Sequence, residues 1–245
     1  MNRPVPHTAV PDSPPSWLRR RLAPEQPRGL RLTLAAVAGL LMLPFTGLAV
    51  LVLTGWPPLR DLDVRVTDAL HAYALTNPGW VRLTSLWTDV FAPNPLRVGA
   101  LFLVLWLVRG GARRLAAWVT VTMVGGGLLG PLLKLVVGRD RPDLLDPVSS
   151  AAGYAFPSGH ALNATLAAGV LLVVFLPAAR GRPGRRAALW AAAVALAVGT
   201  GLSRIVLGVH WTSDVLAGWL LGAAVVTATV AGFALWRARP PAPPT

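Results

Sequence analysis

The sequence predicts an all-α integral membrane protein, a bundle of six membrane-spanning helices with one further helix between the first two spans. Hydrophobic residues make up 54% of the 245 residues and charged residues only 13%, whereas about a quarter of the residues in a soluble domain are charged. Several apolar runs approach or exceed the roughly 20 residues that a helix needs to cross a bilayer. The chain contains no cysteine, which excludes disulfides and thiolate chemistry.

Six apolar runs mark the expected spans, at 33–53, 96–108, 115–137, 161–176, 187–202 and 215–235. The first run follows a long polar lead and is itself too long for a typical cleaved signal peptide. The second run is too short to cross a bilayer alone. We expect it to extend back toward Leu83, despite Asp89 and the break at "APNP".

A polar stretch, residues 55–95, separates the first two expected spans. Apolar and small residues fall at helical spacing within it, namely Leu62, Val66, Ala69, Leu70 and Tyr73. This pattern predicts an amphipathic helix. Such a helix would either lie on the membrane surface or pack on the bundle as an ordinary loop helix, and the pattern favours neither.

The ends of the chain have a different composition from the spans. Residues 1–30 are rich in proline and arginine and are predicted to form a disordered cytoplasmic tail. Residues 31–237 form the predicted six-span membrane domain. Residues 238–245 form a second, proline-rich tail.

The distribution of charge predicts the orientation of the bundle in a cell membrane. With six spans, the N-terminal tail, "RGGARR", "RGRPGRR" and "RAR" would share one side, with 15 of the 23 basic residues and two of the ten acidic ones. Such an excess marks the cytoplasmic side, so both termini are expected there. The net charge of +13 therefore reports membrane topology, and we expect no nucleic-acid partner.

Three polar clusters lie at span ends on the predicted outer face. The first is "KLVVGRDRP", which contains Lys134, Arg139 and Arg141. Arginine binds phosphate oxygens with a planar fork and lysine acts as a point charge. Taken alone, these residues would better suit cations that extend to the membrane interface.

The second cluster, "PSGH", contains Ser158, Gly159 and His160. Proline and serine here are signals of a helix start, and the unpaired N–H groups of a helix start attract anions. Gly159 would allow a ligand to approach the backbone closely, with His160 beside it. The plain alternative is a capped helix with an incidental histidine.

The third cluster, "SRIVLGVHWTSD", contains Arg204, His210 and Asp214. His210 and Asp214 are four residues apart and share a helix face if the last span begins near Trp211. A carboxylate bonded to one imidazole nitrogen fixes the tautomer and leaves the other nitrogen free to attack. A structural contact at a helix end would explain this pair alone. The three clusters together, at one membrane level, point instead to a phosphate site.

These stretches resemble the motifs of the type-2 phosphatidic acid phosphatase superfamily, which also includes vanadium haloperoxidases. "KLVVGRDRP" fits K-x6-R-P, "PSGH" fits the second motif, and "SRIVLGVHWTSD" fits S-R-x5-H-x3-D. The resemblance covers about residues 98–235, and no motif position departs from the pattern.

The resemblance implies a role for each motif residue. His210 would be the nucleophile that forms a phosphohistidine, oriented by Asp214, and His160 would protonate the leaving oxygen and then activate water. The remaining motif residues would bind the phosphate group, namely Lys134, Arg141, Ser158, Gly159 and Arg204. Arg139 is not a motif position and is expected at the rim of the site.

Metal chemistry is the competing interpretation of one segment. "DRPDLLD" places Asp140, Asp143 and Asp146 three residues apart, and a group of carboxylates suggests a divalent-cation site. Pro142 disfavours a regular helical face there, and the resemblance implies metal-independent catalysis without a cofactor. We therefore expect no metal site.

The function predicted from these residues is hydrolysis of a lipid phosphate or lipid pyrophosphate on the outer leaflet. A lipid phosphotransferase that uses an alcohol in place of water is an alternative enzyme, since a phosphohistidine permits both. A non-enzymatic lipid transporter or lipid-binding protein on the same scaffold is the alternative from another class, and the complete motif set disfavours it. Haloperoxidase chemistry is disfavoured by the membrane spans.

Overall fold

The computed structural model describes residues 28–237, within which every element is helical and no β-strand occurs. The all-α prediction is confirmed for this part of the chain. The two predicted tails lie outside the described residues, except that the first helix already begins at Arg28. The elements in chain order are α2 (Arg28–Leu53), α3 (Pro57–Thr76), α4 (Pro78–Val90), α5 (Pro93–Arg109), α6 (Arg113–Thr120), η1 (Val121–Gly125), α7 (Gly126–Val137), α8 (Gly159–Phe175), η2 (Leu176–Ala179), α9 (Pro183–Val194), η3 (Ala195–Gly199), α10 (Thr200–Val206) and α11 (Thr212–Arg237).

Five continuous helical segments are long and apolar enough to cross a membrane, at Leu32–Leu53, Arg113–Val137, Gly159–Ala179, Pro183–Val206 and Thr212–Ala234. Two of them join α-helices through a π-helical turn, η1 or η3. A sixth candidate consists of α4 and α5 together, which are bent by 40° where they meet. The short apolar run does extend backward as expected, but as a separate helix, because Pro93 and Pro95 begin α5 and cannot continue α4.

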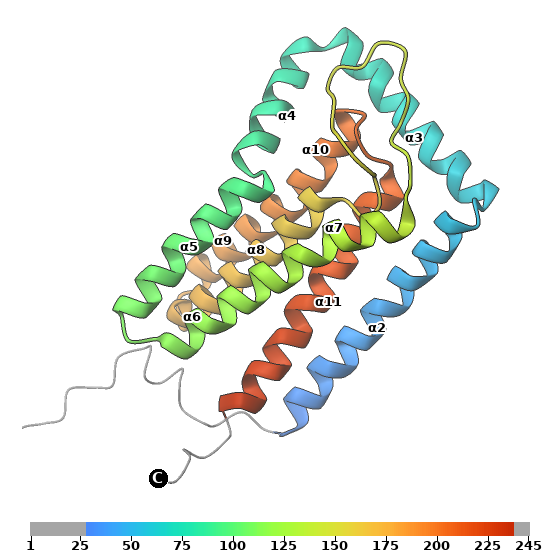
Figure 1. Cartoon of the computed structure of the whole chain (residues 1–245). Helices are drawn as coiled ribbons and strands as arrows, with labels where there is room; N and C mark the ends of the chain where they lie inside the picture. The colour runs from blue at the N-terminus through green and yellow to red at the C-terminus, as the bar shows by residue number, and fades with distance from the viewer. Residues whose placement is uncertain (1–27, 238–245) are drawn as a thin grey trace, which may run out of the picture.

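The polar stretch between the first two spans forms α3 and α4. Figure 1 shows α3 running across one end of the bundle, from the end of α2 toward α4. Val66 and Leu70 pack against Ala161, Ile205 and Val215, while Leu62 and Tyr73 are exposed. The helix therefore packs on the bundle through one face and leaves part of its apolar side uncovered.

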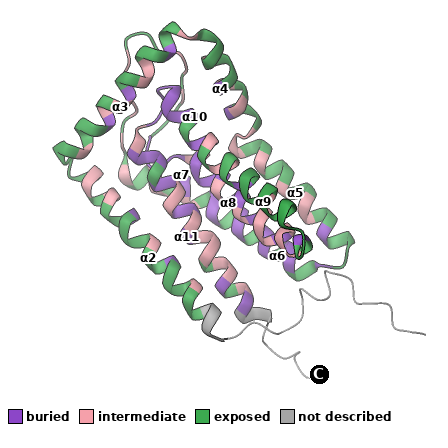
Figure 2. Cartoon of the chain, turned by 180° about the vertical axis from the view of Figure 1, so that it is seen from behind, coloured by how far each residue is buried: buried purple, intermediate pink, exposed green. Residues whose placement is uncertain are grey.

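The helices α8 and α11 form the centre of the bundle. Buried Leu162, Leu166 and Val170 from α8 and Leu221 from α11 belong to one apolar core, and Figure 2 shows buried residues concentrated on the inner helices. Where apolar side chains exchange lipid for protein, close packing rather than burial from water stabilises the contact. Small residues allow that packing: a Cβ added at Gly218 would lie 2.7 Å from the carbonyl oxygen of Ser158.

The outer surface of the bundle is apolar along its length. Large side chains such as Leu40, Phe102 and Leu135 are 62%, 67% and 73% exposed. An apolar surface of this extent is typical of a protein that lies in lipid.

The connections of the bundle divide between its two ends. The α3 end carries α3, the long loop 138–158 and the turn between α10 and α11 (Figure 1). The terminal end carries the first turn of α2, the last turn of α11 and the α5–α6 and α8–α9 connections (Figure 1). All three polar motifs begin or end at the α3 end, so the fold brings them together as expected.

Candidate active site

The loop that follows α7 begins with a sharp change of direction. Gly138 adopts a left-handed conformation, with φ of 62°, and its N–H donates to the carbonyl oxygen of Lys134. This glycine ends the helix in the usual way. The chain then runs without a helix to Ser158, which lets Arg139 leave the axis of α7 and reach α11, and Arg141 reach the turn between α10 and α11.

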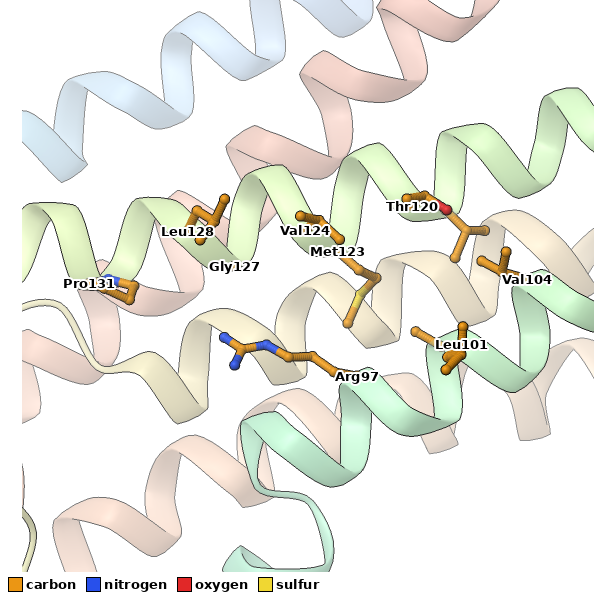
Figure 3. Close-up of a pocket in the computed structure, with 11 residues that line it drawn as sticks. Arg97, Leu101, Val104, Thr120, Met123, Val124, Gly127, Leu128 and Pro131 are labelled. Carbon is orange, nitrogen blue, oxygen red and sulfur yellow. The ribbon is translucent and has the colours of Figure 1, made fainter.

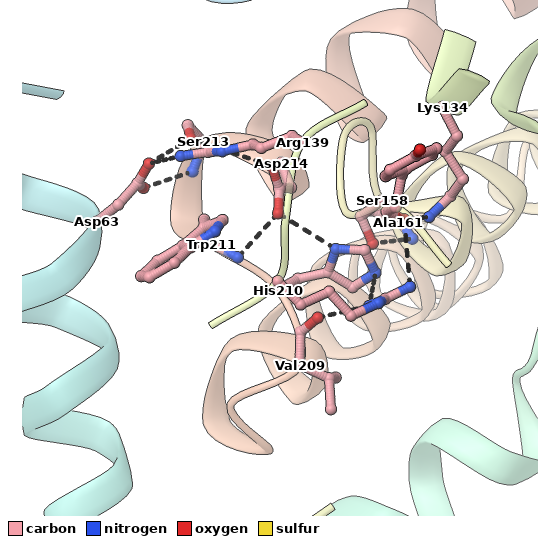
Figure 4. Close-up of polar contacts among 12 residues, drawn as sticks. Asp63, Lys134, Arg139, Ser158, Ala161, Val209, His210, Trp211, Ser213 and Asp214 are labelled. Atoms are coloured by element: carbon pink, nitrogen blue, oxygen red, sulfur yellow. Dashed lines mark hydrogen bonds and ion pairs between the residues drawn. The ribbon is translucent and has the colours of Figure 1, made fainter. Parts of the chain in front are cut away.

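His210 lies at the centre of the polar cluster, only 2% exposed (Figure 4). Its Nδ1 is 3.3 Å from Oδ2 of Asp214, and its Nε2 is 3.2 Å from Nη1 of Arg141. Arginine can only donate hydrogen bonds, so Nε2 is the acceptor and the proton of the neutral ring is on Nδ1. The carboxylate of Asp214 accepts the hydrogen bond from this Nδ1–H group. The lone pair of Nε2 therefore points away from the carboxylate, toward Arg141.

The electrostatic surroundings keep His210 neutral. Burial lowers the pKa of His210 to about 4, against the opposing effects of the hydrogen bond and charge of Asp214. Burial also lowers the pKa of the Arg141 guanidinium from its usual value. A neutral imidazole beside a cation is suited to attack an electrophile that brings its own negative charge.

The motifs contribute three cations, called the motif cations below, namely Lys134, Arg141 and Arg204. Backbone carbonyl groups hold the first two. Arg141 donates to the carbonyl oxygens of Val209 at 2.5 Å and Gly153 at 2.8 Å. The carbonyl oxygen of Tyr154 accepts from both Lys134 and Arg141. Neutral partners fix these side chains without cancelling their charge, so positive charge remains available for an anion.

Arg204 completes the group of cations from α10. It is buried, and its Nη1 donates to Oγ1 of Thr88 on α4 at 3.0 Å. Its Nε is buried without a hydrogen-bond partner. A buried donor without an acceptor is costly, and an oxyanion in the cluster would satisfy it. The charges of Lys134, Arg141 and Arg204 act on one another.

The PSGH motif forms the start of α8. Oγ of Ser158 accepts from the N–H of Ala161, and the N–H of Ser158 donates to the carbonyl oxygen of Asp214 at 2.9 Å. The space beside Gly159 is open, because nothing lies within 4 Å of a Cβ placed there. His160 is part-buried, and the charges of Arg204 and Arg141 act on it. The structure therefore brings all eight predicted site residues to one end of the bundle.

Arg139 does not lie at the rim, and that expectation was wrong. Its side chain is 15% exposed, and its Nη1 is 2.6 Å from Oδ1 of Asp214. Its Nη2 is 2.8 Å from Oδ2 of Asp63, a residue of α3 that the sequence analysis did not select. The sequence signal that could have identified Asp63 is its helical spacing from Thr67 and Ala74, which are also buried.

The segment "DRPDLLD" contains the three aspartates considered above for a metal site. Within residues 28–237, no group of three or more histidine, cysteine, aspartate or glutamate side chains is placed to hold a metal ion. The backbone of Asp140 instead accepts a hydrogen bond from Nε1 of Trp211 at 2.9 Å. The polar cluster around His210 contains cations, imidazoles and the carboxylate of Asp214.

An apolar cleft of about 420 Å³ lies between α5 and the helix formed by α6, η1 and α7 (Figure 3). Leu101, Val104 and Val124 are among its lining residues, and Arg97 is its charged one. Pro131, at one end of the cleft, precedes Lys134 by about one helical turn. The cleft therefore ends, along α7, close to Lys134, one of the predicted phosphate-binding residues.

Comparison with known proteins agrees with this geometry. The sequence model of the PAP2 superfamily matches residues 115–238. A crystal structure of a transmembrane PAP2 type phosphatidylglycerolphosphate phosphatase from Bacillus subtilis superimposes with a TM-score of 0.69 at 24% identity, covering 79% of this chain and 94% of that one. This likeness shows the fold, that of a multi-pass membrane protein.

Curated relatives of the chain are lipid phosphatases. An undecaprenyl-diphosphatase of Sulfolobus acidocaldarius is 32% identical over 48% of this chain and 55% of its own length. A lipid A 1-phosphatase of Rhizobium etli is 35% identical over 44% of this chain and 46% of its own. Phosphatidylglycerophosphatase B of Bacillus subtilis is 35% identical over 39% and 46%. The chain thus spans about half the length of these relatives.

Proposed function

The chain belongs to the PAP2 superfamily, and from that premise we propose that it is a membrane phosphatase of lipid phosphates or lipid pyrophosphates. The observation that carries the proposal is the setting of His210. Its Nε2 faces Arg141, its Nδ1 faces Asp214, and the motif cations around it are held largely by uncharged partners. Such a site attracts a phosphoryl group and offers it a neutral nucleophile.

The first half of the reaction transfers the phosphoryl group to His210. A phosphoryl oxygen takes over the donor of Arg141, which frees the lone pair of Nε2. Nε2 then bonds to phosphorus while the bond to the leaving oxygen breaks, and His160 donates a proton to that oxygen. The ring of His210 becomes positively charged, and Asp214 stabilises it through Nδ1–H.

The second half releases inorganic phosphate. His160, now neutral, accepts a proton from water, and the oxygen of that water bonds to phosphorus. The bond between phosphorus and Nε2 breaks, and its electron pair returns to His210. Lys134, Arg141, Arg204, the hydroxyl of Ser158 and the N–H of Gly159 bind the phosphoryl oxygens throughout. No step requires a metal ion.

The apolar cleft supports a lipid as substrate. A pocket that is apolar along its walls and ends near a polar cluster suits a molecule with one charged end. The relatives named for undecaprenyl diphosphate, lipid A and phosphatidylglycerophosphate share that chemistry. We propose that the tail enters the cleft and the phosphate group reaches His210.

The charge pattern supports a location on the outer leaflet. Basic residues of the α5–α6 and α8–α9 connections lie at the terminal end, opposite the cluster. If this end faces the cytoplasm, the site opens at the outer face.

The test is phosphate release by the purified protein in detergent and EDTA. The substrates are phosphatidic acid, phosphatidylglycerol phosphate and a polyprenyl pyrophosphate, and the matched control is His210→Asn. We expect release from at least one substrate, persistence in EDTA, and inhibition by vanadate, which adopts the five-coordinate geometry of the transition state. Loss of activity in EDTA that Mg²⁺ restores would contradict the metal-free mechanism.

The same assay separates the alternatives. Transfer of phosphate to an added alcohol, in preference to water, would identify a phosphotransferase. Lipid binding without release from any substrate would favour the transporter.

A further inference from the structure

An unusual carboxylate lies behind the proposed nucleophile. Asp63 belongs to α3, outside the segment that matches the superfamily, and it is only 1% exposed. Its Oδ2 accepts from Nη2 of Arg139 at 2.8 Å and from Oγ of Ser213 at 2.5 Å. Its Oδ1 accepts the N–H of Ser213 at 2.9 Å. A charge buried this completely is stable only when it is paired.

Arg139 joins this carboxylate to the one that orients the histidine. Its Nη1 donates to Oδ1 of Asp214 at 2.6 Å and to Oγ of Ser213 at 2.7 Å. The other oxygen of Asp214 accepts from His210 and from the N–H of Trp211. A continuous chain of contacts therefore runs from Asp63 through Arg139 and Asp214 to His210 (Figure 4).

We infer that Asp63 is a positioning residue for the phosphotransfer step, acting on His210 through Arg139 and Asp214. This inference rests on the proposed function, because it assigns Asp63 a part in the reaction of His210. Asp63 touches no motif cation and so has no direct contact with phosphate.

The geometric part of its role concerns the start of α11. Ser213 lies in the first turn, where backbone N–H groups have no helical partner. Asp63 accepts hydrogen bonds from the N–H and from the hydroxyl of Ser213. This fixes the turn that carries both Trp211 and Asp214, and with it the distance from Asp214 to His210.

The electrostatic part concerns the charge on Arg139. Without Asp63, the whole positive charge of Arg139 would act on Asp214, at 2.6 Å. Asp214 would then stabilise the positively charged ring of phosphorylated His210 less well. With Asp63 present, two carboxylates share one guanidinium, and a net negative charge remains to face the imidazole.

The test is the steady-state kinetics of Asp63→Asn, which keeps the size of the side chain and removes its charge. We expect kcat to fall roughly tenfold to a hundredfold, by analogy with the loss of groups that orient metal-binding histidines without touching the metal. KM should stay within about twofold, because Lys134, Arg141 and Arg204 are untouched. Asp68→Asn, an exposed aspartate on the same helix, is the matched control and should behave as wild type.

A second variant keeps the inference testable if Asp63→Asn does not fold. Arg139→Lys retains the positive charge, but one ammonium group cannot bridge two carboxylates as the guanidinium fork does. It should show the same fall in kcat at constant KM. Asp63→Asn should add little to Arg139→Lys, because both changes break the same chain of contacts.

The outcomes distinguish this inference from the proposed function. The inference fails, and the proposed function stands, if the wild-type protein releases phosphate and folded Asp63→Asn has the same kinetics. The same holds if the variant shows a raised KM at unchanged kcat. Additive losses in the double variant would also overturn it. If the wild-type protein releases phosphate from no lipid phosphate, the proposed function fails and this inference falls with it.

Discussion

The two histidines of the site have different neighbours, and the difference predicts different consequences of replacing them. His210 is clamped between Asp214 and Arg141, whereas His160 opens α8 beside the free space at Gly159. His210→Asn removes the attacking nitrogen, so no phosphoenzyme should form with any substrate. His160→Ala removes a proton donor, which matters most for a poor leaving group such as the alkoxide of a monoester.

The measurement compares both variants on a monoester and on a pyrophosphate. His160→Ala should lose more activity on the monoester, because a leaving phosphate needs less protonation. Its second step should also slow, so labelled phosphohistidine should accumulate with a pyrophosphate after quenching without acid. Label on His210→Asn, or equal losses of His160→Ala on both substrates, would show that the roles are misassigned.

Burial of His210 also predicts how the stability of the protein depends on pH. The folded state holds its pKa near 4, below the ordinary value of 6.5. Between these values the unfolded chain binds a proton that the folded protein does not, so the free energy of unfolding falls as the pH drops from 6.5 toward 4. Thermal unfolding in detergent should show that the free energy of unfolding falls less over this pH range for His210→Asn than for wild type. The difference should be a few kcal/mol at most. Parallel curves for the two proteins would contradict this assignment.

The contact between α8 and α11 holds the PSGH motif in place. A Cβ at Gly218 would lie 2.7 Å from the carbonyl oxygen of Ser158, which is backbone and cannot rotate away. Gly218→Ala should therefore separate the helices and disturb the hydrogen bond from Ser158 to Asp214. We expect a loss of about 1–3 kcal/mol in stability and a marked loss of kcat.

Gly232 on the same helix is the matched control, because nothing lies within 4 Å of a Cβ placed there. Gly232→Ala should leave activity unchanged and stabilise the helix slightly. Unfolding midpoints and phosphate release measure both variants. If the two alanines behave alike, close packing at Gly218 does not position the motif.

The apolar cleft makes a prediction about substrate length. Val124 lines the cleft and is 55% exposed, whereas Val121, 60% exposed, does not line it. Val124→Trp should fill the cleft and raise KM for a long-chain lipid phosphate several-fold, as expected when apolar contacts are lost. A short-chain, water-soluble phosphate should be hydrolysed as by wild type. A similar rise for Val121→Trp would place the tail elsewhere.

What the sequence could predict depended on how local the signal was. Helices and motifs are local patterns, so the apolar runs and all eight motif residues were found, and the structure brings them together. Asp63 and Arg139 are 76 residues apart, and no periodicity links them. The apolar pattern of α3 selected Val66 and Leu70, which do pack on the bundle, but it gave no reason to select the polar residues Asp63 and Thr67, which are buried on the same helix.

At the scale of the whole molecule, orientation remains a prediction, and the chain is well suited to test it. It contains no cysteine, so a single introduced thiol is the only one that can be labelled. Ser150, beside Ser149 in the loop 138–158, is exposed at the α3 end, and Gly184, at the start of α9, is exposed at the terminal end. Nothing lies within 4 Å of a Cβ at Gly184, so a cysteine fits there without displacing a neighbour.

In intact cells, a membrane-impermeant thiol reagent should label Ser150→Cys and leave Gly184→Cys unlabelled. The physical reason is the excess of basic residues at the terminal end, which is retained on the cytoplasmic side. Permeabilised cells provide the control, in which both variants should react because both sites are exposed. Labelling of Gly184→Cys alone in intact cells would show that the protein has the opposite orientation, with His210 at the inner leaflet. Equal labelling of both variants in intact cells would put the two sites on the same side of the membrane. In that case α8, which lies between them in the sequence, would not cross it.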